Sequence, residues 1–266
     1  MRDFHLQKWY FDGVDSTGRA LIAYSAQLKW HGIQVPYSGY LYLRAPGDVR
    51  SENKFVQAAG LEVTADAIDL KFGNLPVHGR WERSSRPITQ RLYENETGYL
   101  DWHCHMPAAQ CQIQVKQDPL LKGWGYVEML EMTLPPWQLG LDELRWGRFA
   151  DPDWPVVWID WIGKLNRRWI FANGRLLDTG GVVSDNVVEA PDKEWALYLK
   201  APQVLEEKEK MKEVFQALAS FLPGIYRMAP LRFIGAAETK WLSEGELHRP
   251  GMPPRKAWVI HELVKF

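Results

Sequence analysis

Long apolar runs are missing from this sequence. No stretch approaches the ~20 apolar residues that a membrane-spanning helix needs, and the opening MRDFHLQKWY has no apolar core of the kind found in secretory signal peptides. We therefore expect a soluble, cytoplasmic protein without a membrane span, for which a peripheral contact with a membrane stays open.

A surplus of charge of either sign is also missing. The chain carries 32 Lys and Arg against 33 Asp and Glu, which leaves a formal net charge of −1 over 266 residues. Binding to a phosphate backbone requires a basic surface. Nucleic acid is therefore excluded as the expected partner.

Residues and motifs that indicate a bound cofactor are scarce. Only Cys104 and Cys111 are present, both inside strand-like segments and neither in a metal-type spacing. Buried, reduced thiols of a cytosolic protein account for them. No GxGxxG, GxSxG or Walker pattern occurs. The sequence therefore predicts no cofactor and no required metal.

Aromatic residues, in contrast, are abundant, with 14 Trp, 10 Tyr and 10 Phe. Such side chains supply core packing, and they also suit the walls of a pocket for a flat or elongated apolar ligand. We expect a hydrophobic small molecule as the partner, and the sequence leaves the oligomeric state open.

Strand patterns occur along almost the whole chain. Short segments rich in β-branched and aromatic residues are separated by Gly, Pro, Asn or Asp, without a βαβ rhythm. The segments are ALIAYSAQLKW, YSGYLYLRA, LEVTADAIDLKF, GYLDWHCHM, CQIQVKQ, GYVEMLEMTL, PVVWIDWIGKLNRRWIFANGRLL, EWALYLKA, LRFIGAAETKWLSEGEL and AWVIHELVKF. This pattern predicts an all-β fold of antiparallel barrels or sandwiches.

One segment, Val204 to Gly224, follows a helical pattern instead. Its apolar residues recur at helical spacing opposite a charged face, and Pro223-Gly224 closes the run. These apolar residues are Met211, Val214, Phe215, Leu218 and Leu222. We predict one amphipathic helix over 204–222, packed on its own domain rather than on a partner.

A domain boundary is expected within Thr133 to Phe149. Pro135 and Pro136 cannot donate ladder hydrogen bonds, so a strand must end before them. We predict two β domains, residues 1–138 and 139–266. A late strand in each half carries a Trp and a His, which favours two related domains.

The stretch GYLDWHCHMP, residues 98–107, combines strand alternation with costly polar residues. On a strand, Tyr99, Asp101, His103 and His105 share one face. The opposite face holds Leu100, Trp102, Cys104 and Met106. The polar face could be a solvated or hydrogen-bonded barrel lining, a ligand-orienting wall, or a metal site. The spacing has little specificity for a metal, which is the least favoured of the three.

Five segments together resemble the tandem lipocalin-like family of hydroxyneurosporene synthase, the carotenoid 1,2-hydratases. They are WHCHMPAAQCQI, GWGYVEMLEMTLPPW, LRWGRF, VWIDWIG and ETKWLS, in the order that the family uses. The resemblance implies two lipocalin-like antiparallel barrels and an apolar cavity. It also implies acid-catalysed hydration, cyclisation or isomerisation of an isoprenoid-like or lipid substrate.

The resemblance further implies a set of site residues. Glu128 in Gly123–Glu128 matches the segment in which the family carries a catalytic Asp, with Tyr126 and His103 as its expected catalytic companions. The residues expected to contact the ligand are Asp101, Trp102, His105, Trp124, Trp146 and Trp158.

The chemistry of such a reaction requires particular features of the active site. Protonating an isolated alkene gives a tertiary carbocation, which requires a strong general acid, a dry pocket and aromatic faces. Burial beside Tyr126 would raise the pKa of Glu128 and keep it protonated. Glu131 falls on the other strand face, and both carboxylates could instead be solvated or ion-paired. A non-catalytic carrier, and a structural protein whose cavity its own tryptophans fill, stay as alternatives.

Overall fold

The computed structural model describes residues 4–55, 58–177, 180–208 and 231–266, and within these ranges it confirms the all-β class. Apart from antiparallel strands, the described residues contain a single turn of 3-10 helix, η1 (Pro136–Gln138), and one short helix, α3 (Leu231–Ile234). The chain separates into two compact units, the first ending at Leu139 and the second beginning at Gly140. The finer domain limits, 1–138 and 139–266, stay a prediction.

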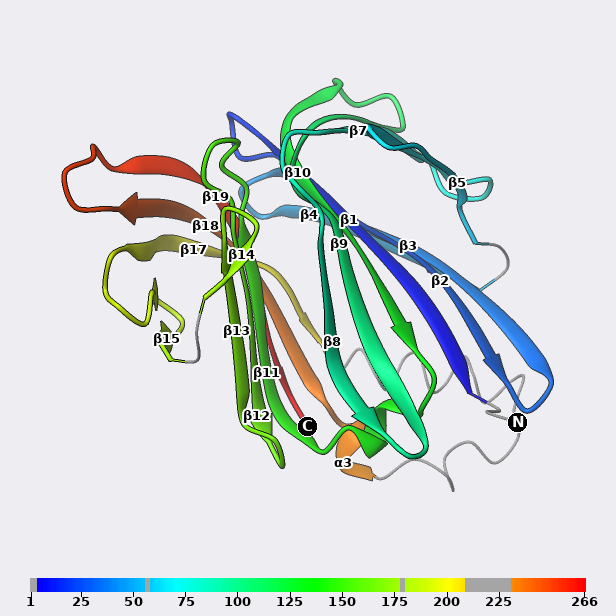
Figure 1. Cartoon of the computed structure of the whole chain (residues 1–266). Coiled ribbons are helices and arrows are strands. Elements are labelled where there is room, and N and C mark those ends of the chain that lie inside the picture. Colours follow the sequence, from blue (N-terminus) through cyan, green and yellow to red (C-terminus); the bar gives the residue numbers. More distant parts are fainter. Residues whose placement is uncertain (1–3, 56–57, 178–179, 209–230) are drawn as a thin grey trace. The chain divides into compact units, whose positions relative to one another are not determined.

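The first unit is an antiparallel meander whose first and last strands pair with each other (Figure 1). Its hydrogen-bonded order is β4-β3-β2-β1-β10-β9-β7-β6-β5, with β8 also paired to β9. The strands are β1 (His5–Asp15), β2 (Ala20–Trp30), β3 (Ile33–Ala45), β4 (Asp48–Lys54), β5 (Gly60–Val63), β6 (Ala67–Lys71), β7 (Val77–Arg83), β8 (Ile88–Asn95), β9 (Gly98–Val115) and β10 (Leu121–Met132). Within the described ranges no ladder joins β4 to β5, and β8 pairs with β9 alone, so the sheet does not close into the predicted complete barrel.

The first sheet curls around a single apolar core. Tyr40 and Tyr42 of β3 belong to the same buried cluster as Ile68 of β6 and Trp81 of β7, although several strands separate them in the ladder. The two ends of one sheet can share a core only if the sheet bends back on itself. Alternate residues of β1, β9 and β10, among them Phe11, supply the rest of this inner face.

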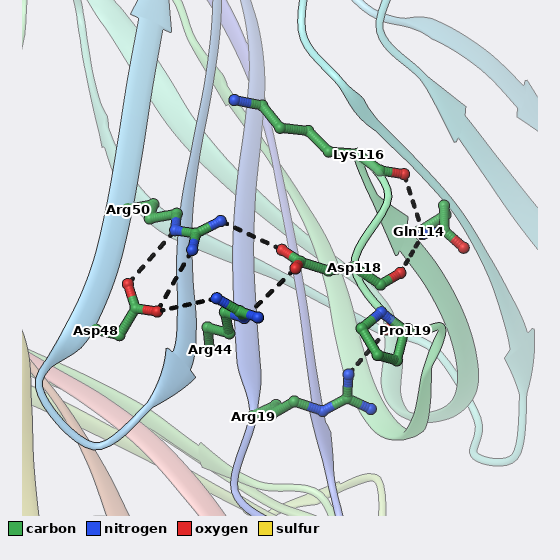
Figure 2. Close-up of polar contacts among 8 residues, drawn as sticks. All are labelled: Arg19, Arg44, Asp48, Arg50, Gln114, Lys116, Asp118 and Pro119. Atoms are coloured by element: carbon green, nitrogen blue, oxygen red, sulfur yellow. Dashed lines mark hydrogen bonds and ion pairs between the residues drawn. The ribbon is translucent and has the colours of Figure 1, made fainter.

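An ion-pair network reinforces the curl (Figure 2). The carboxylate of Asp118, in the turn between β9 and β10, lies 3.4 Å from both Arg44 and Arg50 of the β3–β4 hairpin. Asp48 completes the network, and Arg19 donates to the carbonyl of Pro119 at 2.8 Å. Because both hairpin arginines are partly exposed to solvent, we expect this network to fix the position of the turn more than it stabilises the fold.

Strand β9 is a single strand of 18 residues, where the sequence predicted two. Its register against β10 shifts twice in succession, from Gly125–Ala109 to Val127–Met106 and then to Glu128–Cys104. The shifts occur around Pro107, which cannot donate to a ladder and is tolerated at such a bulge. At the same place β9 changes its other partner, from β8 to β7.

The second unit repeats the plan of the first. Its order is β14-β13-β12-β11-β19-β18-β17-β16-β15, so the first and last strands again pair at the centre. The strands are β11 (Leu141–Phe149), β12 (Val156–Gly163), β13 (Arg167–Ala172), β14 (Arg175–Leu176), β15 (Val182–Val183), β16 (Val187–Glu189), β17 (Ala196–Lys208), β18 (Ala237–His248) and β19 (Arg255–Lys265). Their inner faces form a second apolar core that includes Phe149, Trp158, Ile170 and Leu197.

Gly147 makes room for Trp158 in this second core, which yields a testable prediction. A Cβ at position 147 would lie 2.1 Å from the Trp158 indole and 2.8 Å from the Cβ of His261. We expect Gly147→Ala to lower the free energy of unfolding by about 1–3 kcal/mol, measured by urea unfolding, because overpacking forces rotamer and backbone shifts. Gly60→Ala is the control, since its new Cβ would meet no atom closer than 3.5 Å. Equal stability of the two variants would contradict this.

A buried charge cluster lies on the opposite face of the second sheet from Trp158. The side chain of Lys240 on β18 is only 1% exposed. Its Nζ lies 3.0 Å from a carboxylate oxygen of Glu262 and 3.9 Å from one of Glu206, and it also forms an ion pair with Glu238. A buried lysine can keep its positive charge only because opposite charges surround it.

The predicted helix over 204–222 is wrong at its start. Val204 to Lys208 belong to β17, where Val204 pairs with Trp241 and Glu206 with Lys240 of β18. The ladder with β18 overrides the helical spacing there, as tertiary pairing commonly overrides local propensity. The remainder, 209–222, lies outside the described residues. None of the helices in the described ranges is long and apolar enough to cross a membrane.

Candidate functional site

Glu128 lies on β10, at the centre of the first sheet, with β1 on one side and β9 on the other. In the ladder, Tyr10 and Cys104 are its direct neighbours, and Asp12 is the neighbour of Tyr126 two residues away. Directly paired residues and alternate residues of a strand share a face. One face of three adjacent strands therefore carries two carboxyl groups among tyrosines and a thiol.

Two donors meet on one oxygen of Glu128. The Tyr126 hydroxyl donates to Oε2 at 2.6 Å, and the Trp102 indole Nε1 donates to the same oxygen. Glu128 is 7% exposed, and the side chains of Tyr126 and Trp102 are fully buried. Because Oε2 accepts both bonds, a proton carried by this carboxyl group would reside on Oε1.

A second buried carboxyl group, that of Asp12 on β1, lies on the same face of the sheet as Glu128. Its Oδ2 accepts a hydrogen bond from the Tyr10 hydroxyl at 3.2 Å, and Asp12 is fully buried. The Tyr10 ring contacts Tyr24 and Tyr126 edge to face, at centroid distances of 5.5 and 6.0 Å. Strand β1, which carries Tyr10 and Asp12, is absent from the strands predicted from the sequence. The alternation in HLQKWYFDGVD is the signal that could have found it.

Burial sets the protonation of the groups around Glu128. It raises the pKa of the Tyr126 phenol well above its usual value, and the nearby Cys104 and Glu128 raise it further. Burial likewise raises the pKa of the Cys104 thiol. Both groups are neutral at neutral pH. Tyr126 therefore acts as a hydrogen-bond donor, and Cys104 is not a thiolate nucleophile.

The structure separates His103 from Glu128. His103 is paired with Met129, so it projects from the opposite face of the sheet, together with Asp101. The expectation that His103 and Glu128 complement each other in one cavity is wrong for this reason. The predicted sharing of a face by Asp101 and His103, and the placement of Trp102 on the other, are confirmed.

His105 lies next to the register shift of β9 and packs inward. Its ring stacks on Trp9 at a centroid distance of 4.8 Å. Burial lowers its pKa to about 4, with further contributions from His103 and Arg83. His105 is therefore neutral at neutral pH, and it is a poor proton donor there.

The remaining predicted ligand contacts lie in three different settings. Trp124 is half-buried and lines a cleft of about 300 Å³ on the first unit. The other residues lining the cleft are Arg80, Glu82, Gln110, Cys111, Gln112, Lys122 and Gly123. Trp146 is buried on β11, and Trp158 belongs to the apolar core of the second unit. Trp158 is thus a packing residue by its position.

Comparison with known proteins shows similarity in fold. Neither protein-family models nor curated proteins gave a match to the sequence. The structure of CghA matches with a TM-score of 0.61 at 8% identity, covering 99% of this chain and 89% of that one. A putative AttH from Nitrosomonas europaea matches with a TM-score of 0.57 at 12% identity, covering 98% and 93%. Kievitone hydratase from Nectria haematococca matches with a TM-score of 0.54 at 8% identity, covering 98% and 88%.

These three structures confirm the resemblance to the tandem lipocalin-like family as a similarity of fold. The matches extend over nearly the whole chain, so they include both meanders. Fold alone does not assign a reaction.

Proposed function

We propose that this chain is an enzyme that modifies an apolar, isoprenoid-like or lipid substrate by acid catalysis, with Glu128 as the proton donor. The observation that carries the proposal is the burial of Glu128 with both the Tyr126 and Trp102 donors on Oε2. That arrangement orients the carboxyl group and makes Oε1 the oxygen that would deliver a proton.

The surroundings of Glu128 fit the intermediate of such a reaction. Protonation of an alkene creates positive charge on carbon, and aromatic faces within about 6 Å stabilise a cation. Tyr10, Tyr24, Trp102 and Tyr126 gather on the face that carries Glu128. The carboxylate left after proton transfer is held by its two donors, which lowers the barrier.

Hydration is one of the acid-catalysed alternatives, and a hydratase occurs among the fold neighbours. One of them is a kievitone hydratase, and CghA has also been solved with Sch210972. We infer hydration, cyclisation or isomerisation as the reaction class, with carotenoid hydration as one example, without a cofactor.

Isotope labelling tests this proposal even while the substrate is unidentified. The purified protein is extracted with organic solvent to recover any bound lipid, and the recovered compounds and a panel of isoprenoids are then incubated with it. In D₂O, proton transfer to carbon leaves one non-exchangeable deuterium in the product. In H₂¹⁸O, hydration adds ¹⁸O, whereas cyclisation and isomerisation do not. A bound ligand returned unchanged and unlabelled would contradict the enzyme and favour a carrier.

A further inference from the structure

A second cluster of polar side chains lies on the face of the first sheet opposite Glu128. Asp101 and His103 of β9 and Glu131 of β10 each offer one ligand atom, and these atoms lie within 4.8 Å of one another. Asp101 and Glu131 are direct partners in the ladder, so the grouping follows from the register of the two strands. All three side chains are partly exposed and can be reached from solvent.

Two neighbouring strands hold these groups in place. His5 of β1 contacts Glu131 through its Nε2, 2.9 Å from Oε1. The Thr89 hydroxyl of β8 lies 3.5 Å from Nδ1 of His103, which leaves Nε2 of His103 as the nitrogen for a ligand. Metal-binding histidines commonly have their second nitrogen oriented by such a partner. Four strands therefore contribute to one small site.

The charge of this cluster favours a divalent cation. Arg91 binds Asp101 through both oxygens, at 2.7 and 2.9 Å, and Glu94 at 2.7 Å. With Glu131, the cluster has three carboxylates for the one guanidinium of Arg91. Each carboxylate has about four lone-pair sites, so Asp101 can accept from Arg91 and still bind an ion.

We propose that Asp101, His103 and Glu131 bind a divalent transition-metal ion of the Zn²⁺ type. Imidazole nitrogen combined with carboxylate oxygen suits zinc and its neighbours in the first row, whereas magnesium and calcium prefer oxygen alone. The ion would join β9 to β10 and, through His5 on Glu131, to β1. This site is independent of the proposed reaction at Glu128, because it lies on the other face of the sheet.

The sequence disfavoured a metal because it offered only the residues of one strand. Asp101, His103 and His105 were the candidate ligands on that strand. The structure directs His105 onto Trp9 and brings in Glu131 from β10 instead. A ligand set that spans two strands cannot be recognised from the spacing within either one.

Titration of the full-length, chelator-treated protein with ZnCl₂ tests the site by calorimetry, and CoCl₂ provides a visible absorption spectrum. We expect one ion per chain and a rise in melting temperature with metal concentration, since an ion bound only to the folded state stabilises it. His103→Ala and Glu131→Gln should each raise the Kd at least tenfold. Thr89→Val, which removes an orienting partner, should raise it about tenfold. His78→Ala, an exposed histidine of β7, should leave it unchanged.

Three outcomes would overturn the proposal. They are the absence of saturable binding to the wild-type chain, an unchanged Kd in Glu131→Gln, and an equal loss of affinity in His78→Ala. Circular dichroism verifies that each variant is folded. If His103→Ala does not fold, Glu131→Gln and the cobalt spectrum decide the question. The spectrum of the wild-type protein must then show coordination by imidazole and carboxylate, and the spectrum of Glu131→Gln must differ from it.

Discussion

Replacing Glu128 with glutamine is expected to lower the turnover rate by a factor on the order of 10² to 10⁴, the usual contribution of one general acid. The amide keeps the shape of the side chain and an oxygen that can accept from Tyr126 and Trp102, but it has no transferable proton. Ligand binding should survive. The measurement is the rate of deuterium incorporation from D₂O into the product, with ligand affinity determined in parallel.

The stability of the same variant separates a catalytic from a structural role. A buried carboxyl group is costly, so Glu128→Gln should leave the free energy of unfolding unchanged or slightly raised. Glu62→Gln, on the exposed face of β5, is the matched control and should alter neither rate nor stability. A loss of several kcal/mol in Glu128→Gln would identify Glu128 as one partner of a buried ion pair. Acid catalysis would then be abandoned and only ligand binding kept.

Replacing Lys240 with methionine is expected to lower the free energy of unfolding by about 3–5 kcal/mol, the usual cost of removing one partner from a buried ion pair. Methionine fills much of the volume of the lysine stem, so the loss reports charge more than packing. Glu206, Glu238 and Glu262 would keep their negative charges close together without the ammonium. Urea unfolding at neutral pH gives the measurement.

Lys200→Met is the control for Lys240. Lys200 on β17 forms an ion pair with Glu246, but its side chain is 53% exposed, and exposed ion pairs contribute only about 0–1 kcal/mol. A loss below about 1 kcal/mol in Lys240→Met would contradict the prediction. It would mean that the three carboxylates release their repulsion by taking up protons or by rearranging.

Local pattern predicted individual strands well, because alternation and turn residues are encoded within each segment. The segment ALIAYSAQLKW coincides with β2 from Ala20 to Trp30. Pairing is a property of two distant segments, so the closure of β1 on β10 was not predictable from either strand. The strands β1, β4, β7, β8, β11, β15 and β16 were missed, although β1 and β7 alternate and could have been recognised from that pattern. The helix prediction failed at Val204–Lys208, where ladder partners decide the conformation.

The difference between features of one strand and features of several strands also explains which parts of the candidate site were predictable. Alternation along one strand placed Tyr126 and Glu128 on a common face, and their hydrogen bond agrees with that. The Trp102 bond, the presence of Asp12 and the separation of His103 from Glu128 all depend on register across strands. Groups on one strand were therefore predictable as far as the register shift. Beyond it the prediction was wrong for Met106, which lies on the face of Val127 and not with Cys104. Groups assembled from two or three strands were not predictable.

The paired register shifts in β9 have a consequence for insertions and deletions in this part of the chain. Each shift adds one residue to β9 relative to β10, and the two together restore the original alternation of side chains. Removing one residue from 105–108 would invert every side chain on one side of the cut, bringing Trp102 to the face of His103 or burying Gln110 in place of Cys111. Removing two would only straighten the strand. Length differences between related chains at this point are therefore expected to occur in twos, and an alignment that places a single-residue gap here misassigns one of the two faces.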